Sequence, residues 1–186
     1  MPIDKKLIKK CLKNDRRSQN LLYKELFSYI MNICIRYKDN YDDAGSALNI
    51  IYLKVLKGLS EYDDSKAILP WVKTIAVRHL IDEYRYEKRH DAIGLDDLPQ
   101  QTLNGHAAAP DMLEVEDILQ MLYRLPSLTK RVFNLFAIDG YKHREIGELL
   151  GMSEGNSKWH LNQARGQLQA LIAIEHKRSE RINLEI

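Results

Sequence analysis

Apolar residues recur every three or four positions along most of this 186-residue chain, and no long segment alternates with a period of two. This spacing places apolar side chains along one side of a helix, whereas a strand would alternate them. In the first half it predicts four helices, at residues 3–12, 18–37, 42–59 and from just after Ser65 to about Arg89. Asp42 and Asp43 are expected to cap the third helix, and Pro70 fits only the first turn of the fourth.

A segment without periodicity, from His90 to Pro110, separates these helices from a second group. Its glycines, prolines and Ala-Ala-Ala-Pro run are typical of a linker. Beyond it the pattern predicts a helix that begins at an Asp111–Glu114 capping box and a second helix that Ser127 caps and Gly140 ends. The expected fold is all-α, with two small four-helix domains at residues 1–90 and 111–175, a linker at 91–110 and a charged, frayed tail at 176–186.

Residues 141–171 have the pattern of a helix-turn-helix. Gly151 follows a short amphipathic helix and suits a left-handed C-cap, and Ser153 can accept the first free N–H groups of a second helix. That second helix buries an apolar face and leaves other side chains for base edges or phosphates: Lys158, Trp159, His160, Asn162, Gln163 and Arg165. A plain corner between two packed helices would show the same turn, so this pattern alone leaves both interpretations open.

The fourth predicted helix of the first domain has another surface suited to nucleic acid. Its charged residues at spacings of four, three and four are Arg78, Asp82, Arg85 and Arg89. Trp71, Tyr84 and Tyr86 lie near them in the sequence. Arginines beside aromatic rings suit backbone tracking and base stacking. A salt-bridged solvent face explains the pattern equally well, because acidic residues interleave with the basic ones.

The net charge of +2 requires any nucleic-acid surface to be a local patch and not a global basic field. The lysine-rich face of residues 5–13 is of a kind that is usually only solvated. Cys11 and Cys34 lie among apolar residues, which favours reduced core cysteines. Since neither a signal peptide nor a membrane span is recognisable, we expect a cytoplasmic protein with no direct membrane insertion.

Common catalytic motifs are missing from the sequence. It has no glycine-rich phosphate loop, no Cys-x-x-Cys, no His-Glu-x-x-His and no Gly-x-Ser-x-Gly. The six histidines are scattered and have no evident Cys, Ser or carboxylate partner. We therefore expect no enzyme activity, no cofactor and no metal site.

Two blocks resemble the two DNA-reading domains of the extracytoplasmic-function (ECF) group of bacterial RNA polymerase sigma factors. The first, residues 68–89, reads ILPWVKTIAVRHLIDEYRYEKR, and the second, residues 125–168, contains LPSLTKRVFNLFAIDGY, EIGELLGMSEG and LNQAR. The resemblance implies an alternative sigma factor, a non-catalytic subunit that binds core RNA polymerase and directs promoter-specific transcription initiation. It implies sigma region 2 and region 4 domains, and an anti-sigma factor is a typical partner of such proteins.

The resemblance also assigns roles to individual residues. Those expected to face the downstream promoter element, or to support the loop beside it, are Trp71, Arg78, His79, Asp82, Arg85, Tyr86 and Arg89. Those expected to face the upstream element are Glu154, Asn156, Lys158, Trp159, His160, Gln163 and Arg165. Those expected to contact the polymerase clamp are Asp43, Asn49, Tyr52 and Lys54.

Three groups of residues depart from the family pattern. The clamp-docking helix, usually acidic and Gln-Glu rich, has Gly45, Ser46, Asn49 and Ile50. Arg78 stands where Asn is common. Trp159, His160 and Gln163 replace a Ser-Arg pair and a later Arg, which exchanges charged contacts for stacking and neutral hydrogen bonds. Two further functions remain open at this point, a helix-turn-helix regulator that acts without polymerase and a protein-interaction adaptor.

Overall fold

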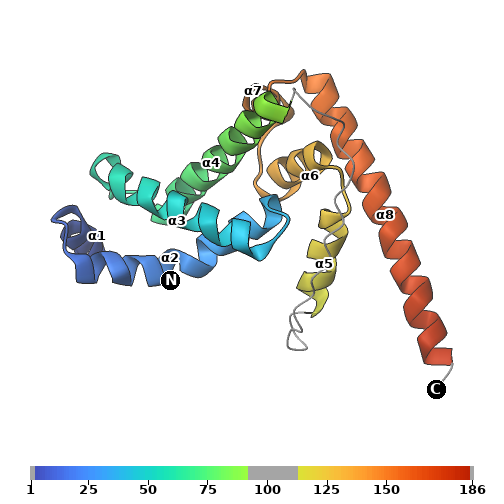
Figure 1. The fold of residues 1–186 in the computed structure, drawn as a ribbon, viewed down its shortest axis with the longest axis horizontal. Coiled ribbons are helices and arrows are strands. Elements are labelled where there is room, and N and C mark those ends of the chain that lie inside the picture. Colours follow the sequence, from blue (N-terminus) through green and yellow to red (C-terminus); the bar gives the residue numbers. More distant parts are fainter. Residues whose placement is uncertain (1–2, 92–112, 185–186) are drawn as a thin grey trace. The chain divides into compact units, whose positions relative to one another are not determined.

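The computed structural model describes residues 3–91 and 113–184, which form helices and turns with no strand among them. The chain divides into two compact units, residues 1–93 and 94–186 (Figure 1). The prediction of an all-α fold with two helical domains is confirmed. The predicted linker lies outside the described residues except for Asp91, which ends a helix.

The first unit contains the four expected helices. They are α1 (Lys5–Leu12), α2 (Arg16–Tyr37), α3 (Tyr41–Gly58) and α4 (Ile68–Asp91), and a 3-10 turn, η1 (Leu59–Glu61), follows α3. Helices α2, α3 and α4 pack against one another, while α1 packs on α2 (Figure 1). Leu26, Ile51 and Val72 are among the fully buried side chains that these three long helices contribute.

Polar side chains begin the first three helices. Asp4 accepts a hydrogen bond from Lys6 N at 2.9 Å and Asp15 accepts one from Ser18 N at 3.0 Å. Asn40 accepts one from Asp43 N at 2.8 Å. The prediction that Asp42 and Asp43 cap α3 is therefore wrong. Both aspartates lie in its first turn, where their charge favours the positive end of the helix dipole.

The second unit consists of α5 (Leu113–Tyr123), α6 (Ser127–Phe133), a π-helical turn η3 (Asn134–Ile138), α7 (His143–Leu150) and α8 (Glu154–Leu184). Leu122, Leu125 and Ala164 form a buried cluster in this unit. The predicted Asp111 cap lies outside the described residues. Ser127 is not a cap: it is the first residue of α6, and its hydroxyl accepts a hydrogen bond from Arg131. The segment expected to fray is helical through Leu184.

The turn between α7 and α8 has the predicted geometry. Gly151 ends α7 in the left-handed conformation, with φ of +69°. Ser153 Oγ accepts a hydrogen bond from Asn156 N at 3.1 Å. A further glycine, which sequence analysis overlooked, is equally important: a Cβ added to Gly147 would lie 2.7 Å from the backbone oxygen of Met152. Gly147 therefore allows α7 to approach the turn backbone closely.

We predict that Gly147→Ala destabilises the second unit by about 1–3 kcal/mol, because the added methyl must displace backbone atoms and not a flexible side chain. Gly166 is a matched control, since a Cβ there meets nothing within 4 Å. Gly166→Ala should stabilise α8 by about 0.5–1 kcal/mol. Urea unfolding, followed by Trp159 fluorescence in a Trp71→Phe background, measures both. Equal stability of the two variants would contradict the close approach.

Candidate nucleic-acid interface

Helix α4 presents a continuous row of charged side chains to solvent. Arg78, Asp82, Arg85 and Arg89 are all exposed, and their spacing places them on one side of the helix. Tyr86 is 59% exposed beside them, with its ring centroid 4.3 Å from that of His90. Five of the seven residues predicted for the downstream element thus share an open surface.

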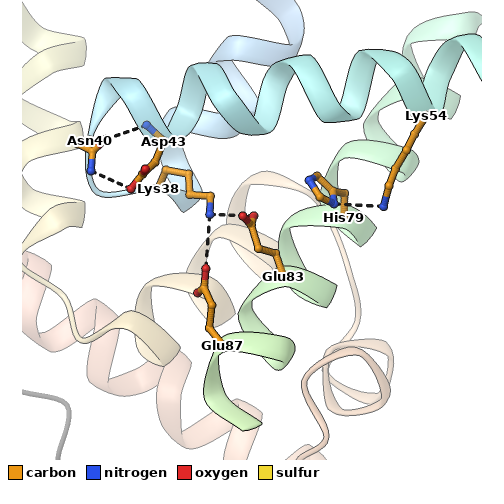
Figure 2. Close-up of polar contacts among 7 residues, drawn as sticks. All are labelled: Lys38, Asn40, Asp43, Lys54, His79, Glu83 and Glu87. Atoms are coloured by element: carbon orange, nitrogen blue, oxygen red, sulfur yellow. Dashed lines mark hydrogen bonds and ion pairs between the residues drawn. The ribbon is translucent and has the colours of Figure 1, made fainter. Parts of the chain in front are cut away.

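Two glutamates next to this row, Glu83 and Glu87, contact a lysine of another segment. Lys38 Nζ, directly after α2, lies 2.8 Å from Glu83 Oε2 and 3.8 Å from Glu87 Oε1, as Figure 2 shows. The Lys38 side chain is only 13% exposed, so these pairs tie α4 to the end of α2. Within the described ranges no ion pair engages Arg78, Arg85 or Arg89. Glu83 and Glu87 therefore contact Lys38 and not the arginines, while the exposed Asp82 lies within the row itself.

His79 lies at the edge of α4 that faces α3. Its Nδ1 is 3.2 Å from Lys54 Nζ (Figure 2). An ammonium group only donates, so Nδ1 accepts and the ring proton of the neutral imidazole is on Nε2. Burial, and next the Lys54 charge, lower the pKa of His79. A neutral His79 therefore connects α4 to α3 and is not part of the open row.

Trp71 is half-buried at the start of α4. Its ring centroid lies 5.1 Å from that of Tyr62, and its ring edge would be 3.2 Å from a Cβ on Gly58. The Tyr62 hydroxyl in turn donates to the backbone oxygen of Lys66. Trp71 thus supports the loop between η1 and α4 through its contact with Tyr62.

The first turns of α8 present most of the residues predicted for the upstream element. The exposed members are Glu154, Asn156, Lys158, Trp159, Gln163 and Arg165. Glu154 Oε1 lies 2.6 Å from Lys158 Nζ, and this hydrogen bond lowers the pKa of Glu154. Trp159 is 57% exposed, while Leu161 and Ala164 are buried. The polar face and the apolar face of α8 are therefore as the sequence predicts.

His160 is the exception on this helix. Its Nδ1 lies 3.0 Å from Oγ1 of Thr129, a buried residue of α6, and its ring packs edge-to-face with Trp159 at 4.8 Å. The structure therefore places His160 between α6 and α8. It orients Trp159 and does not face outward with it.

A further histidine contact, which the sequence pattern does not indicate, lies at the helix-turn-helix itself. His143 Nδ1 of α7 lies 2.9 Å from Oγ of the buried Ser157 in α8. The His143 ring stacks on Phe136 with centroids 4.4 Å apart, and the Arg165 guanidinium lies 6.0 Å from the same Phe136 ring. These contacts connect α7 and η3 to α8.

The predicted polymerase contacts on α3 divide into two kinds. Asp43, Asn49 and Lys54 are exposed. Tyr52 is buried, donates its hydroxyl to the backbone oxygen of Gln19, and packs edge-to-face with Tyr23 at 5.0 Å. Burial raises the pKa of Tyr52 to about 12. Tyr52 thus belongs to the α2–α3 contact and not to the outer surface.

Exposed apolar residues occupy the surface of α3 instead. Ile50 is 44% and Leu53 is 56% exposed, and Tyr41 at the start of the helix is more exposed still. A hollow beside them, between α2 and α3, is lined by residues that include Phe27, Met31 and Tyr41. Leu53 and Tyr41 fall outside the apolar stripe that the helical spacing predicts for α3, and no signal in the sequence indicates that they form an exposed apolar surface.

Both cysteines are buried free thiols, as predicted, and burial raises the pKa of Cys34 to about 12. In the described part of the chain no helix is long and apolar enough to cross a membrane. Nor do His, Cys, Asp and Glu side chains gather there in a group that could hold a metal ion.

One helical unit has a basic and aromatic helix face, and the other has a helix-turn-helix. This combination is typical of proteins that bind DNA through two domains. Residues 22–90 match the family model for sigma-70 region 2, and residues 116–168 match that for sigma-70 region 4. The chain belongs to the sigma-70 family, in its ECF group, and is an alternative sigma factor that directs transcription initiation.

Several relatives agree with this assignment. The ECF RNA polymerase sigma factor SigM of Bacillus subtilis is 25% identical over 79% of this chain and 93% of its own. SigM of Mycobacterium tuberculosis (strain H37Rv) is 23% identical over 91% of this chain and 84% of its own. The sigma factor RpoE of Bartonella quintana, solved with the anti-sigma factor NepR, shares the fold with a TM-score of 0.57. It is 18% identical and covers 82% of this chain and 97% of its own. None of these comparisons supports a polymerase-independent regulator.

We predict that Lys54→Gln raises the pKa of His79, because a neighbouring cation that disfavours the imidazolium is removed while burial remains. An NMR pH titration of the His79 ring protons measures the change, and Lys24→Gln, at an exposed lysine of α2, should leave it unaltered.

The lowered pKa of His79 in the wild-type protein makes the free energy of unfolding depend on pH. Since the folded pKa lies below the unfolded one, the unfolded state binds more protons, and stability falls as pH decreases through the ordinary histidine range near about 6.5. Lys54→Gln should lose less stability over this range. An unchanged His79 pKa in that variant would contradict the contact.

Proposed function

We propose that this sigma factor holds promoter DNA on two helix faces, with α4 on the downstream element and α8 on the upstream element, while α3 docks on core RNA polymerase. The observation that carries the proposal is the exposure of both polar faces, one in a region 2 domain and one in a region 4 domain. Two linked heads gain affinity by avidity, which suits a chain with a net charge of only +2.

On the downstream element, the arginines of α4 would contact phosphates and Tyr86 would stack on an unpaired base. His79, held by Lys54, would position α4 and not read DNA itself. Trp71 would support the loop from Tyr62 to Lys66. By the resemblance to the family, this loop would bind an unpaired base.

On the upstream element, α8 would enter the major groove, the groove that accepts a helix. Asn156 and Gln163 are suited to adenine edges, and Lys158 to a phosphate or guanine. The exposed Trp159 ring offers apolar contact to a thymine methyl group, and His160 positions that ring. Glu154 is paired with Lys158, so its role would be to orient the lysine.

On polymerase, Ile50 and Leu53 would form an apolar centre within a rim of Asp43, Asn49 and Lys54. An apolar centre with a polar rim is the usual anatomy of a protein interface. This chemistry would replace the acidic and Gln-Glu rich contacts of the family.

The remaining parts of the proposal concern organisation and regulation. The region 2 domain would comprise residues 1–90 and the region 4 domain residues 111–175, with the linker at 91–110. The chain would act in the cytoplasm without catalytic activity of its own. An anti-sigma factor would hold it inactive, which is supported by the similarity to RpoE, a sigma factor solved in complex with NepR.

We predict that Arg85→Ala weakens promoter binding by about 1–3 kcal/mol. Lys158→Ala should also weaken promoter binding, and should reduce the salt dependence of the affinity by the amount expected for the loss of about one phosphate contact. In vitro transcription with core polymerase on a genomic promoter library, together with promoter affinity at several salt concentrations, measures both. Lys24→Gln is the control. If the wild-type protein with core polymerase yields no promoter-specific transcript, the proposed function is wrong.

We predict that Leu53→Glu lowers the affinity for core polymerase at least about tenfold, because an unpaired carboxylate would be buried at the apolar centre of the interface. Leu21→Glu is a matched control, at a leucine of α2 that is 49% exposed. Fluorescence anisotropy with labelled protein and core polymerase gives the two affinities. Equal losses in both variants would exclude α3 as the docking surface.

A further inference from the structure

Positive charge is concentrated at the corner where α1 meets α2. Residues 4–17 contain seven basic and two acidic residues, a net charge of +5, whereas the whole chain has +2, so the rest of the chain carries a net −3. All seven basic side chains are exposed; they form what we term the basic corner, Lys5, Lys6, Lys9, Lys10, Lys13, Arg16 and Arg17.

The two acidic residues of this segment serve as helix caps. Asp4 accepts from the first turn of α1, and Asp15 accepts from Ser18, which lowers the pKa of Asp15. Lys5 Nζ lies 3.9 Å from Asp64 Oδ1. The other six basic side chains make no ion pair with any described residue, so most of the charge of the basic corner is available to a partner.

The backbone brings these charges together. Ile8 and Cys11 of α1 are buried, which leaves the lysines on the other side of the helix. Asn14, with φ of +59°, forms the tight turn into α2, where Arg16 and Arg17 follow at once. The result is one patch from two helices.

The charges of the basic corner have mixed effects on the two helices. Lys5-Lys6 and Arg16-Arg17 lie in the first turns of α1 and α2, where the helix dipole disfavours a cation. Asp4 and Asp15 cap the same two helix ends, and Lys9 and Lys10 lie in the last turn of α1, where a cation is favoured. Helix stability therefore does not account for the basic residues in the two first turns.

The position of the basic corner within the first unit indicates its partner. Helix α1 contacts η1, and Lys5 pairs with Asp64 in the loop that Trp71 braces at the start of α4. The corner thus adjoins the loop in which an unpaired base is proposed to bind. DNA held by α4 that continues beyond this loop would bring its phosphates to the corner.

We infer that the basic corner binds the phosphate backbone of promoter DNA, without reading bases, where the DNA continues past the downstream element. The inference rests on the proposed role of α4. Lysine is a flexible point charge that suits phosphate in any sequence, and phosphate contacts carry no direct base information. The corner therefore supplies affinity and salt dependence and leaves sequence preference unchanged.

Salt dependence of promoter binding by the reconstituted holoenzyme tests the inference. Each lost phosphate contact reduces the slope of log affinity against log salt concentration by about 0.7–0.9. Lys9→Gln should reduce it by about that amount and Lys9→Gln/Lys13→Gln by about twice as much, equally on different promoters. Glutamine has a similar helix propensity to lysine, so α1 is retained. Lys24→Gln should leave the slope unchanged.

A DNA truncation provides the second arm of the test. Removing the DNA beyond the downstream element should lower the slope of the wild-type holoenzyme by more than that of the double variant, in which two of the seven basic side chains of the corner are replaced. An unchanged slope in the double variant on full-length DNA overturns the inference while the proposed function stands. A loss of affinity for core polymerase without a change in slope also overturns it, because the corner is then a protein contact.

Failure of the proposed function gives a different result. The wild-type holoenzyme would then form no promoter complex, and the free chain would be titrated with a promoter-free DNA duplex. Weaker binding by the double variant than by the wild type and Lys24→Gln still supports phosphate binding at the corner. Equal binding by all three overturns it.

Discussion

Burial of one apolar face on each helix is the constraint on which both proposed DNA-binding surfaces depend. Val72, Ala76 and Leu80 are buried on α4, and the 3.6-residue turn then leaves the arginine row outside. Leu161 and Ala164 do the same for α8 and leave Lys158, Trp159 and Gln163 exposed. Burial of the apolar residues therefore determines which side chains of α4 and α8 are exposed and could contact DNA.

Burial sets the face, but polar contacts between helices set the orientation. Three histidines each make one such contact, His79 with Lys54, His143 with Ser157 and His160 with Thr129. Each joins an exposed reading helix to a neighbouring helix of the same unit. Since directional hydrogen bonds resist rotation and sliding, these histidines hold the helices in register and would contribute to the proposed DNA recognition indirectly.

The sequence was sufficient to predict the helices, the two domains and the turn at Gly151, because periodicity and cap chemistry are local signals. Features that depend on distant neighbours were not predictable. Tyr52 and His160 were expected at the surface, yet they contact residues 33 and 31 positions away. Gly147 escaped notice because its importance lies in the backbone of Met152. Asn40 was missed because three polar residues near one helix start compete for the cap, and geometry decides among them.

The distribution of charge indicates that the two units would contribute differently to DNA binding. In α8 the neutral residues Trp159 and Gln163 face outward and Lys158 is paired with Glu154, so the second unit would gain less from counterion release than the first. The first unit has the unpaired arginines of α4 and, at its other end, the basic corner. Sequence-independent affinity would thus come from the first unit, and the second unit would contribute base contacts that are weak alone. Because linked sites multiply their affinities, a weak but selective upstream head is enough to distinguish promoters once the first unit holds the DNA.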